Sequence, residues 1–337
     1  MRNKLIRSLI LLPIIAASVV PAHAQWSLRK HRRDRDFVQP NTWAIGMTLG
    51  TTDLWGDVGT KGLVDHYNNS NYTSNMKFMG GMYGRYTAHP ALGIRLGFNF
   101  GTLYASDEFN FEKAKKAKST EDDYYQRYLR NQKVKNIIWD GHLLFEFNPL
   151  RMNVDNDHAR NRRFQPYLMA GIGGFYMTPK AEYKNRVTGQ TKWQNIYDLH
   201  LEGDGFGKLA DGSGTYDAPA RYKRYQLSIP MGIGFRWDVG KQLGLGIEYL
   251  YRYTFTDYLD GVSDRYVNPA VFDANLNAKN AAIAKDVYDR SWIIDPTVTH
   301  APGELRGNKA VPDGYSTLSI NFYYKVKSKR IPWWYQR

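Results

Sequence analysis

Residues 91–104 read Ala-Leu-Gly-Ile-Arg-Leu-Gly-Phe-Asn-Phe-Gly-Thr-Leu-Tyr, and every second residue from Leu92 to Phe100 is large and apolar. The positions between them are small or polar and include Arg95 and Asn99. Neighbouring side chains of a β-strand point to opposite faces. Strands of membrane barrels alternate lipid-facing apolar residues with small or polar ones over about ten residues. The stretch therefore predicts a transmembrane β-strand.

Seven further stretches show this alternation. It is clear in residues 225–237, 242–256 and 317–324, and weaker in residues 43–52, 76–87, 133–147 and 164–178. Eight strands predict an all-β fold, an eight-stranded antiparallel transmembrane β-barrel of the outer-membrane type over residues 43–327. A soluble β-sandwich has the same period and is the alternative. Aromatic strand ends favour the barrel, because such rings form girdles at the two membrane interfaces.

Composition agrees with a β-rich chain and removes several kinds of chemistry. The 337 residues are 42% hydrophobic and 15% aromatic, with 30 glycines, which suits strands better than a helical bundle. There is no cysteine. Disulfide frameworks, thiolate metal sites and cysteine nucleophiles are therefore excluded.

The first 24 residues predict a signal peptide. Arg2, Lys4 and Arg7 precede the apolar residues 9–20, and Ala22-His23-Ala24 is a small-x-small cleavage site. A retained anchor is the alternative, but the apolar run is shorter than the ~20 residues that a spanning helix needs. We expect export, followed by insertion into the outer membrane as a barrel.

The connections between the expected strands alternate in length. Connections one, three, five and seven have 23, 28, 43 and 56 residues, whereas two, four and six have 3, 16 and 3. Bacterial barrels place long loops outside and short turns in the periplasm, so both termini are expected in the periplasm. Within the long loops, Ser119 and Asp122 predict a capping box before a helix at 124–129. Asn268-Pro269 predicts the start of a helix that runs to about Tyr288.

Charge falls unevenly on this topology. The long connections carry a net charge of −4, and the parts expected in the periplasm carry +11. Most of the excess lies in a basic N-terminal segment, residues 25–42, and around a C-terminal tail, residues 328–337. The basic residues are Arg29, Lys30, Arg32 and Arg33 in the first run and Lys325, Lys327, Lys329 and Arg330 in the second. Because an exported barrel rarely meets nucleic acid, we expect anionic lipid headgroups or an acidic periplasmic protein as the partner. Solvated tails without a partner are the alternative.

Charged residues also occupy inward positions of the expected strands. They include Arg95, Asp140, Glu146, Arg236, Glu248 and Arg252. An eight-stranded barrel is just wide enough for side chains, and buried charges of both signs must pair. We predict a structural ion-pair network in a plugged lumen, in preference to a proton relay or an open pore.

Catalytic and metal motifs are weak. No Gly-rich phosphate loop, His-Glu-x-x-His or Gly-x-Ser-x-Gly occurs. Asp140-x-His142-x-x-x-Glu146 could support acyl transfer if a serine joined it. Asp257, Asp260 and Asp264 could bind calcium but lack the spacing of a known loop, so we expect them to bond local amides. No cofactor or metal is predicted.

Three stretches carry a family resemblance. They are residues 43–57, with Leu54-Trp55-Gly56-Asp57; residues 220–236; and residues 248–263, with Phe255-Thr256-Asp257-Tyr258-Leu259-Asp260-Gly261-Val262-Ser263. Together they resemble the PorG-like family of Bacteroidota outer-membrane barrels. The resemblance implies a non-enzymatic component of the type IX secretion system that links the outer membrane to a periplasmic ring of a lipoprotein and its partner.

The resemblance suggests roles for two groups of residues. Thr256, Asp257, Tyr258, Asp260 and Ser263 are expected to form a structural or docking motif, and the two basic runs to face the ring. The third and fourth long loops look larger than in a compact family member, which leaves a paralogue with another surface task open. Two other functions stay open: a stand-alone surface-binding or structural barrel that acts through its outer loops, and a membrane-embedded enzyme that depends on His142.

Overall fold

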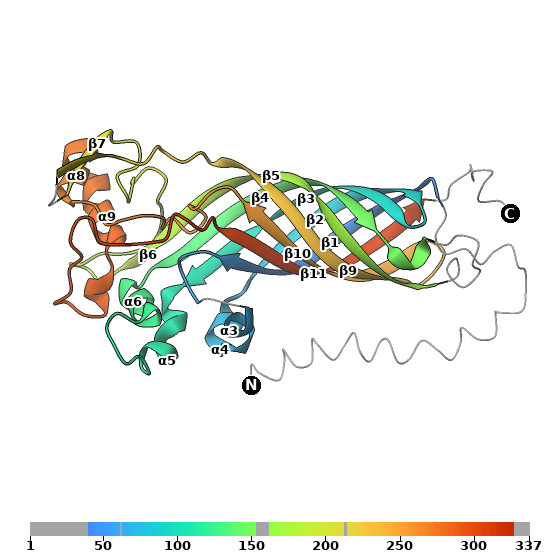
Figure 1. Ribbon diagram of the computed structural model, residues 1–337, viewed down its shortest axis with the longest axis horizontal. Coiled ribbons are helices and arrows are strands. Elements are labelled where there is room, and N and C mark those ends of the chain that lie inside the picture. The colour runs from blue at the N-terminus through green and yellow to red at the C-terminus, as the bar shows by residue number, and fades with distance from the viewer. Residues whose placement is uncertain (1–39, 61–62, 153–161, 212–213, 327–337) are drawn as a thin grey trace, which may run out of the picture.

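The computed structural model describes residues 40–60, 63–152, 162–211 and 214–326 and shows a closed barrel of eight antiparallel strands (Figure 1). The barrel strands are β1 (Thr42–Trp55), β2 (Lys77–His89), β3 (Leu92–Ser106), β4 (Lys133–Phe147), β5 (Phe164–Lys184), β9 (Tyr225–Asp238), β10 (Leu243–Thr254) and β11 (Gly314–Val326). Each pairs with its neighbours in chain order, and β1 pairs with β11 to close the ring. The predicted fold is confirmed.

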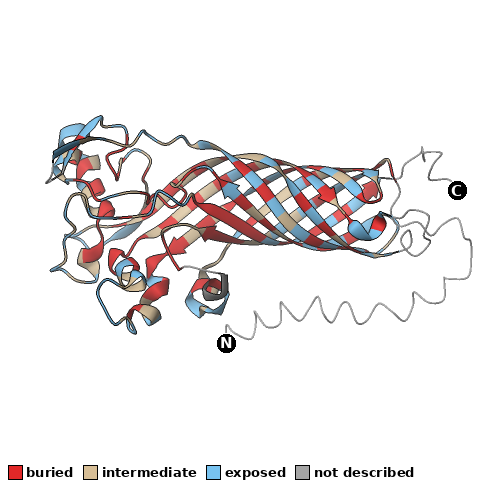
Figure 2. Ribbon diagram, viewed as in Figure 1, coloured by how far each residue is buried: buried red, intermediate tan, exposed pale blue. Residues whose placement is uncertain are grey.

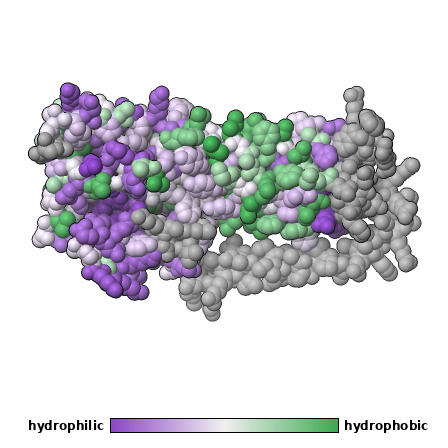
Figure 3. Space-filling model, viewed as in Figure 1, coloured by the Kyte–Doolittle hydropathy of each residue, from purple (hydrophilic) through white to green (hydrophobic). Residues whose placement is uncertain are grey.

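Side chains alternate between the two faces of the barrel wall, as the sequence predicts. On β3, Leu96 is 67% exposed, whereas the neighbouring Arg95 is 2% exposed. Figure 2 shows the same alternation of buried and exposed residues along the other strands. Figure 3 shows the exposed hydrophobic side chains gathered over the barrel, away from the loops. An apolar exterior around a polar interior identifies a barrel that spans a membrane.

The two ends of the barrel differ. At one end, here called the turn end, β1 begins and β11 ends, with Trp43 opposite Val326. Residues 90–91 and 239–242 make the short turns at this end, and the longer connection between β4 and β5 contains the 3-10 helix η3 (Pro149–Arg151). The other end, here called the loop end, carries the four long connections. The predicted alternation of long and short connections is therefore confirmed.

The long connections contain short helices and strands. The first holds α3 (Leu63–Asn68) and α4 (Ser70–Asn75); the second holds η2 (Asp107–Asn110), α5 (Phe111–Ala114) and α6 (Asp123–Arg130); the third holds β6 (Thr191–Asn195), β7 (Lys208–Asp211) and β8 (Gly214–Asp217); and the fourth holds α8 (Ala270–Asn275), α9 (Ala278–Tyr288) and η4 (Ser291–Ile293).

Two details of the predicted helices are wrong. Asp122, not Ser119, is the N-cap of α6, because its side chain accepts the amide hydrogens of Tyr124 and Tyr125. The helix expected from Pro269 to Tyr288 is two helices. The chain leaves helical geometry at Leu276, and Asn277 then caps α9 by accepting the amide of Asn280.

The loop-end connections pack into one folded unit, here called the cap. Inward residues of the strands become apolar towards this end, as Leu103, Ile138 and Met177 show, and all three are buried. Leu259 and Val262 from the fourth connection join the same hydrophobic cluster. The mouth of the barrel is therefore filled by the loops that follow its strands.

Candidate functional site

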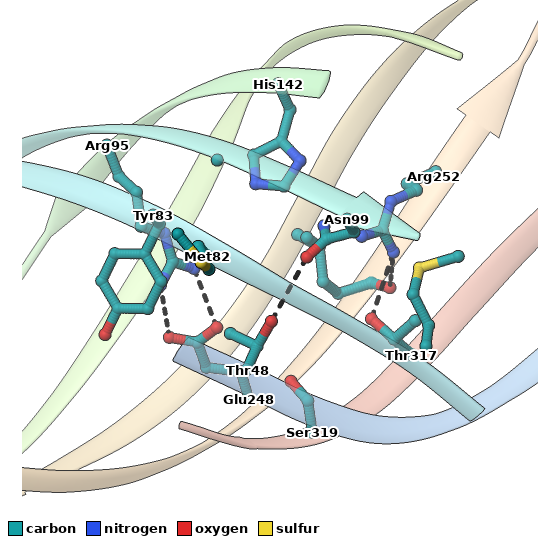
Figure 4. Close-up of a pocket in the computed structure, with 13 residues that line it drawn as sticks. Thr48, Met82, Tyr83, Arg95, Asn99, His142, Glu248, Arg252, Thr317 and Ser319 are labelled. Atoms are coloured by element: carbon teal, nitrogen blue, oxygen red, sulfur yellow. Dashed lines mark hydrogen bonds and ion pairs between the residues drawn. The ribbon is translucent and has the colours of Figure 1, made fainter. Parts of the chain in front are cut away.

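The lumen contains the charged residues that the sequence places there, and Figure 4 shows Arg95, Glu248 and Arg252 among them. Arg95 on β3 donates from Nη1 to Glu248 Oε1 at 2.7 Å and from Nη2 to Glu248 Oε2 at 2.8 Å. Tyr167 on β5 donates its hydroxyl to the same carboxylate. The Arg95 guanidinium also lies 4.5 Å from the ring of Tyr83. This bidentate geometry is the strong form of an arginine–carboxylate pair.

Glu146 on β4 joins three arginines. Arg236 Nη2 lies 2.8 Å from Oε2, Arg95 Nε lies 3.4 Å from Oε1, and Arg85 Nη1 lies 3.7 Å from Oε2. All four side chains are buried. Arg236 also lies over the ring of Tyr167 at 4.0 Å. Buried charges are tolerated only when paired in this way.

A second group lies nearer the loop end. Arg252 Nε donates to Asp140 Oδ2 at 2.7 Å, and Arg252 Nη1 donates to Thr317 Oγ1 at 3.1 Å. Asn99 Nδ2 donates to the same Asp140 oxygen at 3.3 Å. The structure thus divides the six charged residues predicted for the lumen between two groups, and Arg85 is a further member of the first.

His142 lies beside Asp140 in this second group. Its Nδ1 is 3.4 Å from Asp140 Oδ1, and its ring packs against the backbone of Gly97. The hydrogen bond that the structure gives its ring goes to Asp140 and not to a serine hydroxyl. The hydroxyl of Ser228 lies across Gly173 from His142, and among the described residues no hydrogen bond joins the two.

Tyrosines fill the rest of the lumen by packing on glycines. Tyr83 lies opposite Gly46, Tyr167 opposite Gly234 and Tyr323 opposite Gly244 in the registers of neighbouring strands. A Cβ atom on any of these glycines would overlap the facing ring. The cavity left between Thr48, Tyr83, Arg95 and Glu248 has a volume of only about 20 Å³, which is room for about one water molecule.

The turn end has a polar group that sequence reasoning missed. Lys325 Nζ lies 2.8 Å from Asp238 Oδ1, and Tyr323 donates its hydroxyl to the same oxygen at 2.6 Å. Gln165 donates to the other oxygen. Lys325 was expected to belong to the solvent-facing basic run, but it is buried in the barrel mouth. The alternation along β11 does place it on the inward face, and this is the signal that could have found it.

The residues of the family motif fold into the other mouth. Asp260 Oδ2 accepts the amide of Val58 at 2.8 Å, and Oδ1 accepts the amide of Val262 at 2.9 Å. Thr256 and Ser263 are buried. Tyr258 stacks on Tyr222, with ring centroids 4.6 Å apart and planes 11° apart. The motif thus ties the first and fourth long connections to the segment that leads into β9.

Carboxyl groups crowd together at this point of the cap. Asp313 Oδ2 accepts the amide of Leu259 at 2.8 Å. Gly56 lies against both Asp260 Oδ2 and Asp313 Oδ1, so closely that a Cβ atom there would collide with them. Burial, with a contribution from Asp57, raises the pKa of Asp260 to about 7, and burial together with Asp260 raises the pKa of Asp313 well above its usual range. Burial also raises the pKa of Asp257 to about 8.

Calcium binding at Asp257, Asp260 and Asp264 gains no support. Across the described ranges, no three His, Cys, Asp or Glu side chains form a group that could hold a metal ion. Asp260 bonds amides instead, and Asp264 pairs with Lys309 at 2.7 Å. The basic residues Arg29, Lys30, Arg32, Arg33, Lys327, Lys329 and Arg330 and the expected signal peptide lie outside the described residues.

Comparisons with known proteins give one partial family match and several similar solved structures. A family model described as a domain of unknown function, DUF6089, matches residues 215–285, which contain β9, β10 and the motif. None of the curated proteins matches the chain. Among solved structures, Ail of Yersinia pestis is 9% identical with a TM-score of 0.33, covering 85% of this chain and 99% of that one. OprG from Pseudomonas aeruginosa is 9% identical with a TM-score of 0.34, covering 86% and 98%.

A third similar structure is a major outer membrane protein from Thermus thermophilus. It is 12% identical with a TM-score of 0.35, covering 84% of this chain and 99% of that one. The barrel fold itself is established by the strand pairing of this chain. In the part of the chain that the structure describes, no helix is both long and apolar enough to cross a membrane.

Proposed function

We propose that this chain is an outer-membrane barrel that works as an anchoring subunit of a type IX secretion system, through its surfaces and not through a pore. The observation that carries the proposal is the filled lumen. Arg95, Glu146, Arg236 and Glu248 occupy its cross-section as a buried ion-pair network. Such a barrel offers a solute no path, so its task belongs to the parts outside the membrane. The specific machinery is the one implied by the resemblance to PorG-like barrels.

The proposed orientation places the loop end outside the cell and the turn end in the periplasm. Short turns at one end and long connections at the other support it, because bacterial barrels follow this arrangement. Both chain ends then emerge in the periplasm. The basic runs at residues 29–33 and 327–330 would face a ring formed by a lipoprotein and its partner, and nucleic acid has no place in this role. The role is non-enzymatic.

Crosslinking in intact cells tests the proposal. A photoreactive residue replaces Arg32 or Lys329, one at a time, in the full chain. We expect ring proteins in the crosslinked product from both positions. A matched probe at Lys279 in the cap, which is exposed, is expected to give none. The secretion role would be rejected if the probes at both tails crosslinked to no other protein and if a strain lacking this chain still secreted normally.

One observation favours a second function, a stand-alone barrel that acts through its cap. The fourth connection has a hydrophobic core, in which Phe272, Ala284 and Val287 are fully buried and which continues into the cluster at the barrel mouth. Loops that only connect strands do not need such a core. Removal of α8 and α9 would then abolish function, while removal of the basic tails would not. The crosslinking experiment separates the two functions, because this one requires no ring contact.

A further inference from the structure

A patch of cationic and aromatic side chains lies on the outside of the barrel near the loop end. We call it the cationic patch. It consists of Lys77, Lys135, Lys180 and Arg224 together with the rings of Tyr104, Tyr176 and Trp193. The strand registers place Lys135 on β4 opposite Tyr104 on β3 and opposite Lys180 on β5. Side-chain contacts add the other members of the patch: Lys77 through Tyr104, Trp193 through Lys135, and Arg224 through Tyr176.

The lysines of the patch lack the partners that surface lysines usually find. Among the residues that the structure describes, none of Lys77, Lys135 and Lys180 forms an ion pair with a carboxylate. Lys133, two residues before Lys135 on β4, has its Nζ 2.8 Å from Glu108 Oε2. The carboxylate of Glu182 has its Oε2 2.7 Å from Arg290 Nη2. The carboxylates beside the patch are therefore engaged elsewhere.

Without a bound ligand, repulsion between the lysines of the patch destabilises the folded protein. Like charges directly opposite each other on neighbouring strands destabilise a sheet, and Lys135 and Lys180 are such a pair. Lys77 also lies near enough to repel the Lys135 ammonium, and Glu182 offsets this repulsion in part. An anion bound between these ammonium groups would remove the repulsion.

Aromatic rings hold the cations against the barrel wall. Lys77 Nζ lies 5.0 Å from the centroid of the Tyr104 ring, and Lys135 Nζ lies 4.0 Å from that of Trp193. Arg224 lies 4.6 Å from the ring of Tyr176, while its Nε and Nη2 donate to Met177 and Thr178. The cationic groups are thus positioned before any ligand arrives.

The lysines of the patch lie beyond the apolar belt, and Tyr176 lies at the edge of the belt, opposite Trp139. Trp139 on β4 and Phe100 on β3 are 46% exposed and face the membrane. Lys135 lies four residues further towards the loop end, which is about 13 Å along the strand and about 10 Å along the membrane normal for a strand tilted by ~40°. That is the level of the headgroups, where aromatic and cationic side chains both favour the interface.

We propose that the cationic patch binds the phosphate groups of a glycolipid in the outer leaflet. The inference rests on the orientation given under the proposed function. Three ammonium groups and the remaining guanidinium nitrogen of Arg224 complement a ligand with two phosphates, and the rings below them suit its acyl chains and sugars. The lipid would fix the depth and rotation of the barrel in the membrane.

Native mass spectrometry of the full-length barrel in detergent tests the inference, with bis-phosphorylated lipid A as the probe. The test variant is Lys135→Gln/Lys180→Gln. The matched control is Lys208→Gln/Lys279→Gln, which removes two exposed cap lysines outside the patch. Each variant is first shown to keep the heat-dependent gel mobility of a folded barrel. We expect the test variant to bind the probe about tenfold or more weakly and the control to bind like the parent.

Two further arms identify the ligand group. Dephosphorylated lipid A is expected to bind the parent as weakly as the probe binds the test variant, and inorganic phosphate is not expected to displace the probe. The inference would be overturned if the test variant and the control bound the probe equally well, or if the parent bound both lipids equally well. Displacement of the probe by inorganic phosphate would also overturn it and would show a site for free anions instead. Crosslinking of the tails to ring proteins does not depend on the patch, so failure here leaves the proposed secretion role standing.

Discussion

Arg95 and Glu248 form a two-pronged salt bridge across the full width of the barrel, with nitrogen–oxygen distances of 2.7 and 2.8 Å. Strands β3 and β10, which carry them, are four strands apart in either direction around the ring. Residues 153 positions apart in the chain thus hold opposite walls together. The same contact blocks the lumen at its centre.

Breaking this pair should destabilise the barrel. In a Glu248→Ala variant, Arg95 keeps its charge in a buried site but loses its bidentate partner. We expect the free energy of unfolding to fall by about 3–5 kcal/mol, measured by urea titration in lipid bilayers. Glu304→Ala, at an exposed position in the cap, is the control and should change it by less than about 0.5 kcal/mol. Similar values for the two variants would contradict the role given to the network.

The glycine–tyrosine pairs give a second prediction. Gly244 lies under the ring of Tyr323, so a Gly244→Ala variant must displace the ring or bend β10. We expect a loss of about 1–3 kcal/mol in unfolding free energy. Gly141→Ala on β4 is the matched control, because no atom lies within 4 Å of its Cβ position. If both alanines were equally tolerated, the lumen would be looser than the structure shows.

The buried carboxyls make the stability of the cap depend on pH. The pKa of Asp260 is raised to about 7 and that of Asp313 is raised well above its usual range. The folded cap therefore keeps protons that the unfolded chain releases above about pH 4, so stability is greatest in acid and falls as pH rises towards 7 and beyond. We expect hydrogen exchange of residues 255–263 to show about 2 kcal/mol less protection at pH 8 than at pH 5.

The variant Asp313→Asn tests whether these carboxyls are the cause. An amide at this position can still accept the Leu259 N–H and carries no charge at any pH. We expect the difference in protection between pH 5 and pH 8 to shrink by at least half. A pH dependence unchanged by this substitution would place its origin in other groups.

Much of the fold follows from a two-residue period in the sequence, whereas the partners of individual residues do not. Alternation predicts that Arg95 and Glu248 face the lumen. It cannot predict that they face each other, because that depends on strand order and stagger in the closed ring. The sequence predicts a single helix from Pro269 because the alanines of this stretch favour helix. The break at Leu276 depends on packing in the cap, which the local sequence does not reveal.

The candidate site was predictable to a similar extent. Inward charges and the residues from Thr256 to Ser263 are visible in the sequence. The buried pairing of Lys325 with Asp238 was missed because a run of basic residues suggests a solvated tail. The crowding of Asp260 and Asp313 joins two residues at opposite ends of a long connection, and no local pattern reports it.

Ion conductance is the most direct test of the claim that this barrel works through its surfaces. The full-length protein is inserted into planar lipid bilayers, and current is recorded across a range of voltages. With the lumen filled by Arg95, Glu146, Arg236 and Glu248, we expect insertion without discrete conductance steps. Reproducible steps typical of an open water-filled pore would contradict the account.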